Sequence, residues 1–174
     1  MNLVYDEELM PDSNPEELDF RVASGLFAGL RDWNENSPET LRLITRFQGR
    51  MIPTVGGMLL FGSARERYFP DAWIQCGRFG GTSKARIVDQ RDIRNHLPLA
   101  LNDAFEFVKK YASQGAEFGE LRRKDVWNMP LEGVREALTN AIVHADYSQT
   151  GAPIRVAIFD DRIESKIPGC WRED

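Results

Sequence analysis

Apolar residues in the first fifty positions recur at the helical period. The segment 14–32 opens with Asn and Pro, a typical N-cap and first-turn pair, and we expect one helix that ends near Asp32. The segment 37–47 opens with Ser-Pro and is apolar at positions 41, 44 and 47, which predicts a second helix. Residues 1–50 are therefore interpreted as a helical N-terminal arm.

The period changes to two in the middle of the chain. A short apolar helix over 58–61, after Gly56-Gly57 and before Gly62, precedes an alternating segment, 72–77, that is typical of a strand. Gly80-Gly81 predicts a turn into a second strand near 84–89, so the two strands should form a hairpin. The segment 92–113 then has the apolar spacing of a long amphipathic helix.

The last third of the chain combines one helix with two strands. We expect an extended stretch over 117–127, a helix that begins at Pro130, a strand over 154–159, and a tight Asp160-Asp161 turn into a further strand. These elements predict an α+β fold with a mixed or mostly antiparallel sheet covered by long helices.

The helix after Pro130 has an apolar face and a polar stripe. At about 100° per residue, Glu136, Asn140, His144 and Tyr147 fall within about 80° of one another. The apolar residues lie near the opposite pole: Leu131, Val134, Leu138, Ala141, Ile142 and Ala145. One face is expected to pack, and the other is free for chemistry.

The polar stripe has two interpretations. The amide oxygen of Asn140 is a hard, neutral ligand suited to Mg²⁺, and the Glu136 carboxylate can order or deprotonate a water beside it. His144 could contact a phosphate or a metal-bound water next to Asn140. The alternative is an ordinary solvated helix face with a structural histidine.

Two longer runs carry a resemblance to a known family. The first is Glu136 to Ser148 followed by Gly151 to Glu164, and the second is Pro53 to Gly62 followed by Pro70 to Phe79. Together they resemble bacterial RecG-related transcriptional regulators, in which a Schlafen AlbA-like domain precedes a module similar to the GHKL ATPases, such as gyrase and histidine kinases. The resemblance implies a two-layer GHKL-like sandwich over residues 51–174, after an AlbA-like domain that is missing before residues 1–50.

By this resemblance, the cofactors are ATP and Mg²⁺. Asn140 corresponds to the magnesium ligand of the family's N-box, and Glu136 to the residue that positions the attacking water. The adenine-contacting signature of the fold, Asp-x-Gly-x-Gly, falls where this chain has Ile167-Pro168-Gly169-Cys170, so Gly169 is expected at the nucleotide and the acid is lacking. We also expect the chain to end before the lid that wraps the triphosphate, and Ala145 replaces an Arg usual in the family.

Composition limits the partners of the chain. Its net charge of -5 argues against a nucleic-acid-binding surface in these 174 residues, so DNA or RNA contact is expected through an absent domain. No apolar run of membrane-spanning length occurs, and the acidic N-terminus is unlike a signal peptide, which together indicate a cytoplasmic protein. Cys76 and Cys170 lack the spacing of a metal site.

Two functional hypotheses follow. In the first, the chain is part of an ATP-binding regulator with a partial nucleotide site and little or no ATPase activity. It has no helicase motor motif, because Gly77 to Lys84 has Thr and Ser before the Lys, unlike a P-loop, and is expected to be a hairpin turn. In the second, it is a noncatalytic structural, dimerising or regulatory module that positions a separate nucleic-acid-binding domain, and it could form a homodimer.

Overall fold

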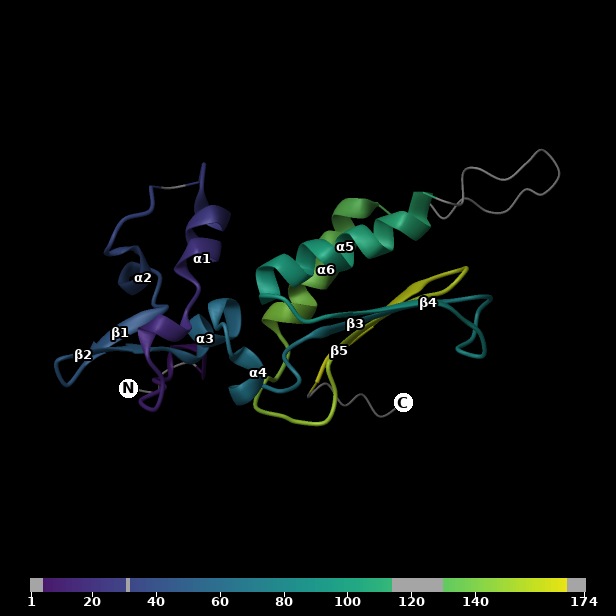
Figure 1. The fold of residues 1–174 in the computed structure, drawn as a ribbon. Coiled ribbons are helices and arrows are strands. Elements are labelled where there is room, and N and C mark those ends of the chain that lie inside the picture. Colours follow the sequence, from purple (N-terminus) through teal and green to yellow (C-terminus); the bar gives the residue numbers. More distant parts are fainter. Residues whose placement is uncertain (1–4, 31, 114–129, 169–174) are drawn as a thin grey trace. The chain divides into compact units, whose positions relative to one another are not determined.

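The structure is a computed structural model that describes residues 5–30, 32–113 and 130–168 (Figure 1). The chain divides between Pro70 and Asp71 into two compact units, which are considered separately below. Residues 51–70 thus pack with the first unit, whereas the family resemblance groups them with the segment that follows. The expected extended stretch over 117–127 and Gly169 both lie outside the described residues.

The first unit combines short helices with a two-stranded hairpin. In chain order its elements are the 3-10 helices η1 (Tyr5–Glu7) and η2 (Pro15–Glu17), α1 (Phe20–Phe27), α2 (Ser37–Thr40), β1 (Ile44–Phe47), β2 (Arg50–Pro53), α3 (Val55–Phe61) and α4 (Arg65–Tyr68). The antiparallel register of β1 and β2 runs from Ile44 opposite Pro53 to Phe47 opposite Arg50. The first fifty residues are therefore not helical throughout.

The helix predicted over 37–47 is wrong beyond Thr40. The backbone of Arg42 is left-handed, with φ of 55°, which ends the helical path. The residues from Ile44 onward then bond to β2 instead, because Ile44 and Ile52 become buried in the pairing. The apolar spacing that predicted a helix therefore reflects an apolar residue buried at the end of a strand.

The helix predicted over 14–32 is divided. Asn14 caps only the single turn of η2, and Leu18 is extended because it bridges to Gly62. Asp19 then starts α1, where its carboxylate accepts hydrogen bonds from the backbone N–H groups of Arg21 and Val22. A tertiary contact therefore overrides the local helical signal.

Helix α3 is held closely against the chain before β1. Thr54 is its N-cap and accepts a hydrogen bond from the N–H of Gly57 at 3.0 Å. The Thr54 hydroxyl also donates to the carbonyl of Arg42 at 2.7 Å. A Cβ on Gly57 would lie 2.1 Å from the carbonyl oxygen of Leu43, so glycine is required there. The predicted helix before Gly62 is confirmed, with its start moved to Val55.

The second unit is a mixed four-stranded sheet with two helices. Its elements are β3 (Ile74–Phe79), β4 (Ile87–Ile93), α5 (Leu97–Ser113), α6 (Leu131–Val143), β5 (Ile154–Ile158) and β6 (Ile163–Lys166). The strand order is β4-β3-β5-β6, in which only β3 and β5 run parallel. Both predicted hairpins and the α+β class are confirmed, although the long helix begins at Leu97 because β4 extends to Ile93.

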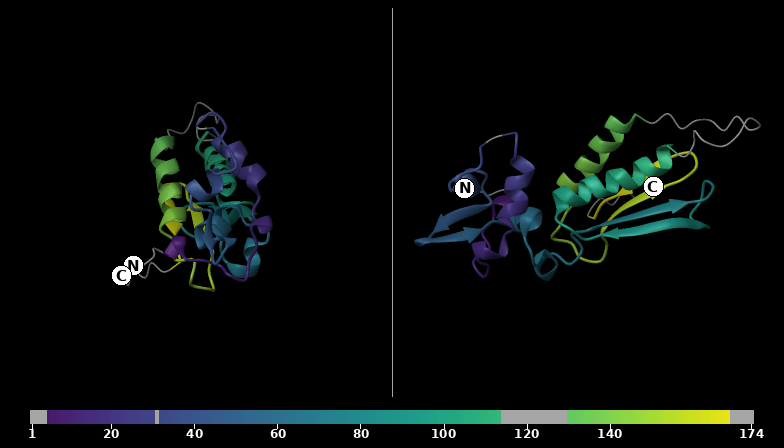
Figure 2. Two further views of the ribbon diagram at one scale, coloured as in Figure 1. Left: turned by 90° about the vertical axis from the view of Figure 1, so that its left-hand side faces the viewer. Right: turned by 45° about the horizontal axis from the view of Figure 1, so that its top comes forward.

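Helices α5 and α6 lie side by side on one face of this sheet (Figures 1 and 2). Alternate residues of the central strands point to the helices, as expected from the period-two pattern. The buried core contains Ile74, Cys76, Ile93, Ala100, Ala104, Phe107, Val108, Val134, Leu138, Ala141, Ile154, Val156 and Ile158. None of the helices in the described ranges is long and apolar enough to cross a bilayer.

Candidate functional site

Helix α6 turns Glu136 and Asn140 away from the core. Val134, Leu138 and Ala141 are at most 5% exposed and pack against the sheet and α5, whereas Glu136 and Asn140 are both exposed. The predicted division between a packing face and a free face is thus observed for these residues. Leu131 is an exception, since it is 38% exposed in the first turn of the helix.

The polar stripe is shorter than predicted. The helix ends at Val143, and His144 is its C-cap, with its N–H donating to the carbonyl of Asn140 at 3.0 Å. The imidazole of His144 is exposed. Tyr147 does not lie on the stripe, because the chain turns after His144, and its hydroxyl donates to the carbonyl of Ile142 at 2.7 Å. Its ring packs against the core cluster.

Asp146 organises the turn that follows α6. Its carboxylate accepts hydrogen bonds from the backbone N–H of Ser148 at 3.1 Å and from the side chain of Gln149 at 2.9 Å, as well as from the Ser148 hydroxyl. These bonds lower the pKa of Asp146, the Ser148 hydroxyl contributing most. The N–H of Asp146 donates to the carbonyl of Pro168, next to the predicted position Gly169.

The free face of α6 carries two groups whose oxygen atoms could ligate a metal, the Glu136 carboxylate and the Asn140 amide. Neither side chain makes a hydrogen bond or an ion pair within the described residues. One amide oxygen and one carboxylate suit Mg²⁺ when phosphate and water oxygens complete its octahedron. The described residues contain no group of three or more His, Cys, Asp or Glu side chains able to hold a metal by themselves. Glu136 and Asn140 could therefore supply only part of a metal's coordination shell.

A neighbouring arginine holds α6 in place on α5. The Arg135 guanidinium donates to the Asn102 amide oxygen at 2.9 Å, and its central carbon lies 5.3 Å from the centre of the Phe105 ring. This contact combines a hydrogen bond with a cation–π interaction. It ties the residue adjacent to Glu136 to α5.

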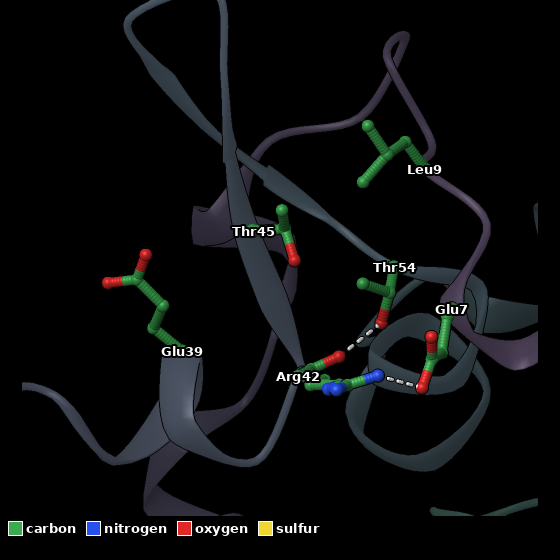
Figure 3. A pocket seen from close by; sticks show the side chains of 6 residues that line it. All are labelled: Glu7, Leu9, Glu39, Arg42, Thr45 and Thr54. Carbon is green, nitrogen blue, oxygen red and sulfur yellow. Dashed lines mark hydrogen bonds and ion pairs between the residues drawn. The ribbon is translucent and has the colours of Figure 1, made fainter. Parts of the chain in front are cut away.

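The first unit contains a pocket that sequence reasoning missed (Figure 3). Its volume is about 350 Å³, and it is lined by Glu7, Leu9, Glu39, Arg42, Thr45 and Thr54. Arg42 is ion-paired with Glu7, and the Thr54 hydroxyl donates to the Arg42 carbonyl. These residues come from three separate stretches of sequence, 7–9, 39–45 and 54, so no motif marks them. Polar groups of Glu7, Arg42 and Thr54 bond one another, and none of the lining residues belongs to α6.

Comparison with known proteins supports the fold alone. No protein-family model matches the sequence, and no match is found among curated proteins. Among solved structures, the chain is similar to the DIP2311 protein from Corynebacterium diphtheriae, with a TM-score of 0.64 and 14% sequence identity. The likeness covers 98% of this chain and 34% of DIP2311, so the chain spans about a third of that protein's length.

Proposed function

We propose that this chain is part of an ATP-binding, RecG-related transcriptional regulator of the cytoplasm, and that residues 71–168 form the first part of a GHKL-like nucleotide-binding domain. The observation that carries this proposal is the exposure of Glu136 and Asn140 on one face of α6, while Val134, Leu138 and Ala141 anchor the opposite face. The four-stranded sheet with both helices on one face is compatible with the two-layer sandwich that the sequence resemblance implies.

In this proposal, the side chains of the polar stripe divide the work. The Asn140 amide oxygen would hold Mg²⁺, and the bound metal would supply charge neutralisation at the phosphate oxygens. The Glu136 carboxylate, one turn earlier, accepts a hydrogen bond from a water and orients it toward the terminal phosphate. His144, exposed at the helix end, would donate to a phosphate oxygen. The place of Gly169 at the nucleotide is what the family resemblance implies, and that residue lies outside the described part of the chain.

A noncatalytic regulatory module is the second candidate function. Two observations favour it: Glu136 and Asn140 have no side-chain partner in the described part of the chain, and residues 167–170 offer no acid for an adenine amino group. Catalytic groups are normally held in place by contacts with neighbouring side chains. We therefore propose that any ATP hydrolysis by this chain is slow. Nucleotide binding or dimer formation would instead position a nucleic-acid-binding domain.

Nucleotide binding can be tested by calorimetric titration with ATP in the presence and absence of Mg²⁺. We expect Asn140→Ala to abolish the Mg²⁺-dependent part of the binding and Glu136→Gln to leave binding in place while lowering any hydrolysis. Thr139→Ala on the same helix is the control, because Thr139 is exposed but lies off the stripe. If Asn140→Ala titrates like the unmodified chain, the assignment is wrong.

A further inference from the structure

The β1–β2 hairpin concentrates positive charge in an acidic chain. Residues 41–54 contain three arginines and no acidic residue, whereas the whole chain has a net charge of -5. Arg46 and Arg50 are exposed, and neither guanidinium has a hydrogen bond or an ion pair with any described residue. By contrast, Arg42 at the base of the hairpin is neutralised by Glu7. The tip therefore presents two uncompensated cations.

An aromatic ring accompanies these cations. Phe47 is 41% exposed and lies directly opposite Arg50 in the register of the two strands, so the two side chains share one face. Arg46, one position earlier, belongs to the other face. An exposed ring next to a guanidinium places an apolar face beside a positive charge, a combination that suits a flat, negatively charged partner.

The hairpin is also stiff. Gln48 and Gly49 have φ angles of 49° and 80°, the left-handed pair that a two-residue type I′ turn requires. Ile44 and Ile52 are buried at the other end of the strands, which anchors the base of the hairpin. The strands extend away from the helices of this unit (Figures 1 and 2). The tip can therefore enter a groove or meet a strand with little loss of conformational entropy.

We propose that the β1–β2 hairpin binds the phosphodiester backbone of a nucleic acid, with Arg46 and Arg50 on phosphates and Phe47 against a base or sugar. A two-stranded ribbon is narrow enough for the major groove of a duplex, and an exposed aromatic ring is the group on which unpaired bases stack. An acidic peptide would match the arginines but would not use the flat face of Phe47. The rest of the chain is acidic, so contact with a nucleic acid is limited to this hairpin. The net charge of the chain therefore does not reveal this basic surface.

The test is fluorescence anisotropy of the full chain with a labelled DNA duplex and with the labelled single strand, over a series of salt concentrations. Two phosphate contacts predict a slope of log affinity against log salt of about −1.8 for the duplex, at about −0.9 per contact. The double variant Arg46→Glu, Arg50→Glu should lose measurable binding, whereas Arg46→Lys, Arg50→Lys should keep the salt slope. Arg21→Glu is the control, since Arg21 is exposed on α1 in the same unit.

Phe47→Ala distinguishes the two forms of nucleic acid. A selective loss of single-strand affinity would identify stacking on an unpaired base, and an equal, small loss on both would identify backbone contact in a duplex; either result supports the proposal. Circular dichroism of each variant should be unchanged, because all three side chains are exposed. The proposal is overturned if neither DNA binds, if the double Glu variant binds as well as the unmodified chain, or if polyglutamate competes as well as DNA. None of these outcomes depends on the nucleotide site of α6.

Discussion

Two neighbouring positions of α6 illustrate how a residue's environment follows from helical phase. Leu138 is 3% exposed within the core between α6 and the sheet, while Glu136, two residues earlier, is exposed. The helical period alone predicted both environments, because each residue lies near the centre of its face. It failed for Leu131, which lies in the first turn of the helix and is 38% exposed.

The helix phase predicts a large difference in stability between two alanine variants. Leu138→Ala should lower the free energy of unfolding by about 2–5 kcal/mol, because it removes buried methyl groups and leaves a cavity. Glu136→Ala should change it by less than about 0.5 kcal/mol, as is usual for an exposed side chain. Urea denaturation followed by circular dichroism measures both. A Leu138→Ala loss below about 0.5 kcal/mol would contradict the packing described here.

Asp146 gives a prediction for acid conditions. Its folded-state pKa is lowered, so the stability that it contributes is complete above its ordinary pKa and is lost as the pH falls through the lowered value. Ser148→Ala removes the largest cause and should raise the pKa of Asp146 toward its ordinary value. Gln149→Ala removes the hydrogen bond that lowers the pKa of Asp146 least, and should raise that pKa less. Titration of the Asp146 carboxyl carbon by NMR measures each midpoint; equal midpoints in the three proteins would refute this.

At the scale of elements, sequence patterns predicted the second unit better than the first. Both hairpins of the sheet are marked by strong local signals, a Gly-Gly pair and an Asp-Asp turn between alternating strands. The first unit has weak signals, because its backbone is decided by long-range contacts: Leu18 bridges to Gly62, and Ile44 is buried opposite Pro53. Apolar spacing at positions 41, 44 and 47 could not reveal that Arg42 adopts a left-handed conformation.

Edge strand β4 shows how the sheet avoids further pairing. It carries Asp89, Arg91 and Asp92, and its register with β3 shifts between Arg78 and Phe79. Charges and such an irregularity both discourage another strand from extending a sheet. The exposed Ile87 and Val88 lie beside this irregularity. The possible homodimer stays a prediction.

Glycine substitutions test the close contact of α3. Gly57→Ala should destabilise the first unit by about 1–3 kcal/mol or more, because the new methyl group would overlap the Leu43 carbonyl. Gly25→Ala is the matched control in α1: no atom lies within 4 Å of its added Cβ, so helix propensity should stabilise the protein by about 0.5–1 kcal/mol. Thermal unfolding should show shifts of opposite sign. A neutral Gly57→Ala would show that α3 and Leu43 are not in contact.

At the scale of the whole molecule, the net charge and the positions of the individual charged side chains lead to different conclusions. The net charge of -5 argues against nucleic-acid contact, yet Arg46 and Arg50, which have no ion pair with a described residue, lie on one hairpin. The sequence also predicted a division after residue 50, whereas the compact units divide after Pro70. Composition and family resemblance describe the kind of chain, but they do not locate the contacts that define a unit.

The candidate nucleotide site was predicted from sequence only as far as one helix determines it. Spacing places Glu136 and Asn140 on the exposed face of α6, but the helix end at Val143 removed Tyr147 from the stripe. Turn chemistry decides that end, since Asp146 gathers the bonds of the following residues. The pocket beside Arg42 was not predictable, because it forms from residues spread between positions 7 and 54.

The most direct test of the proposed function is to follow the backbone amide chemical shifts of the chain during titration with ATP, with and without Mg²⁺. We predict localised shifts in α6 around Asn140 that require Mg²⁺ and that disappear in Asn140→Ala. The amides of α3, in the first unit, should remain unchanged and serve as the internal reference. If millimolar ATP and Mg²⁺ leave the amides of α6 unmoved, this chain has no nucleotide site on that helix, and the noncatalytic regulatory module becomes the better account.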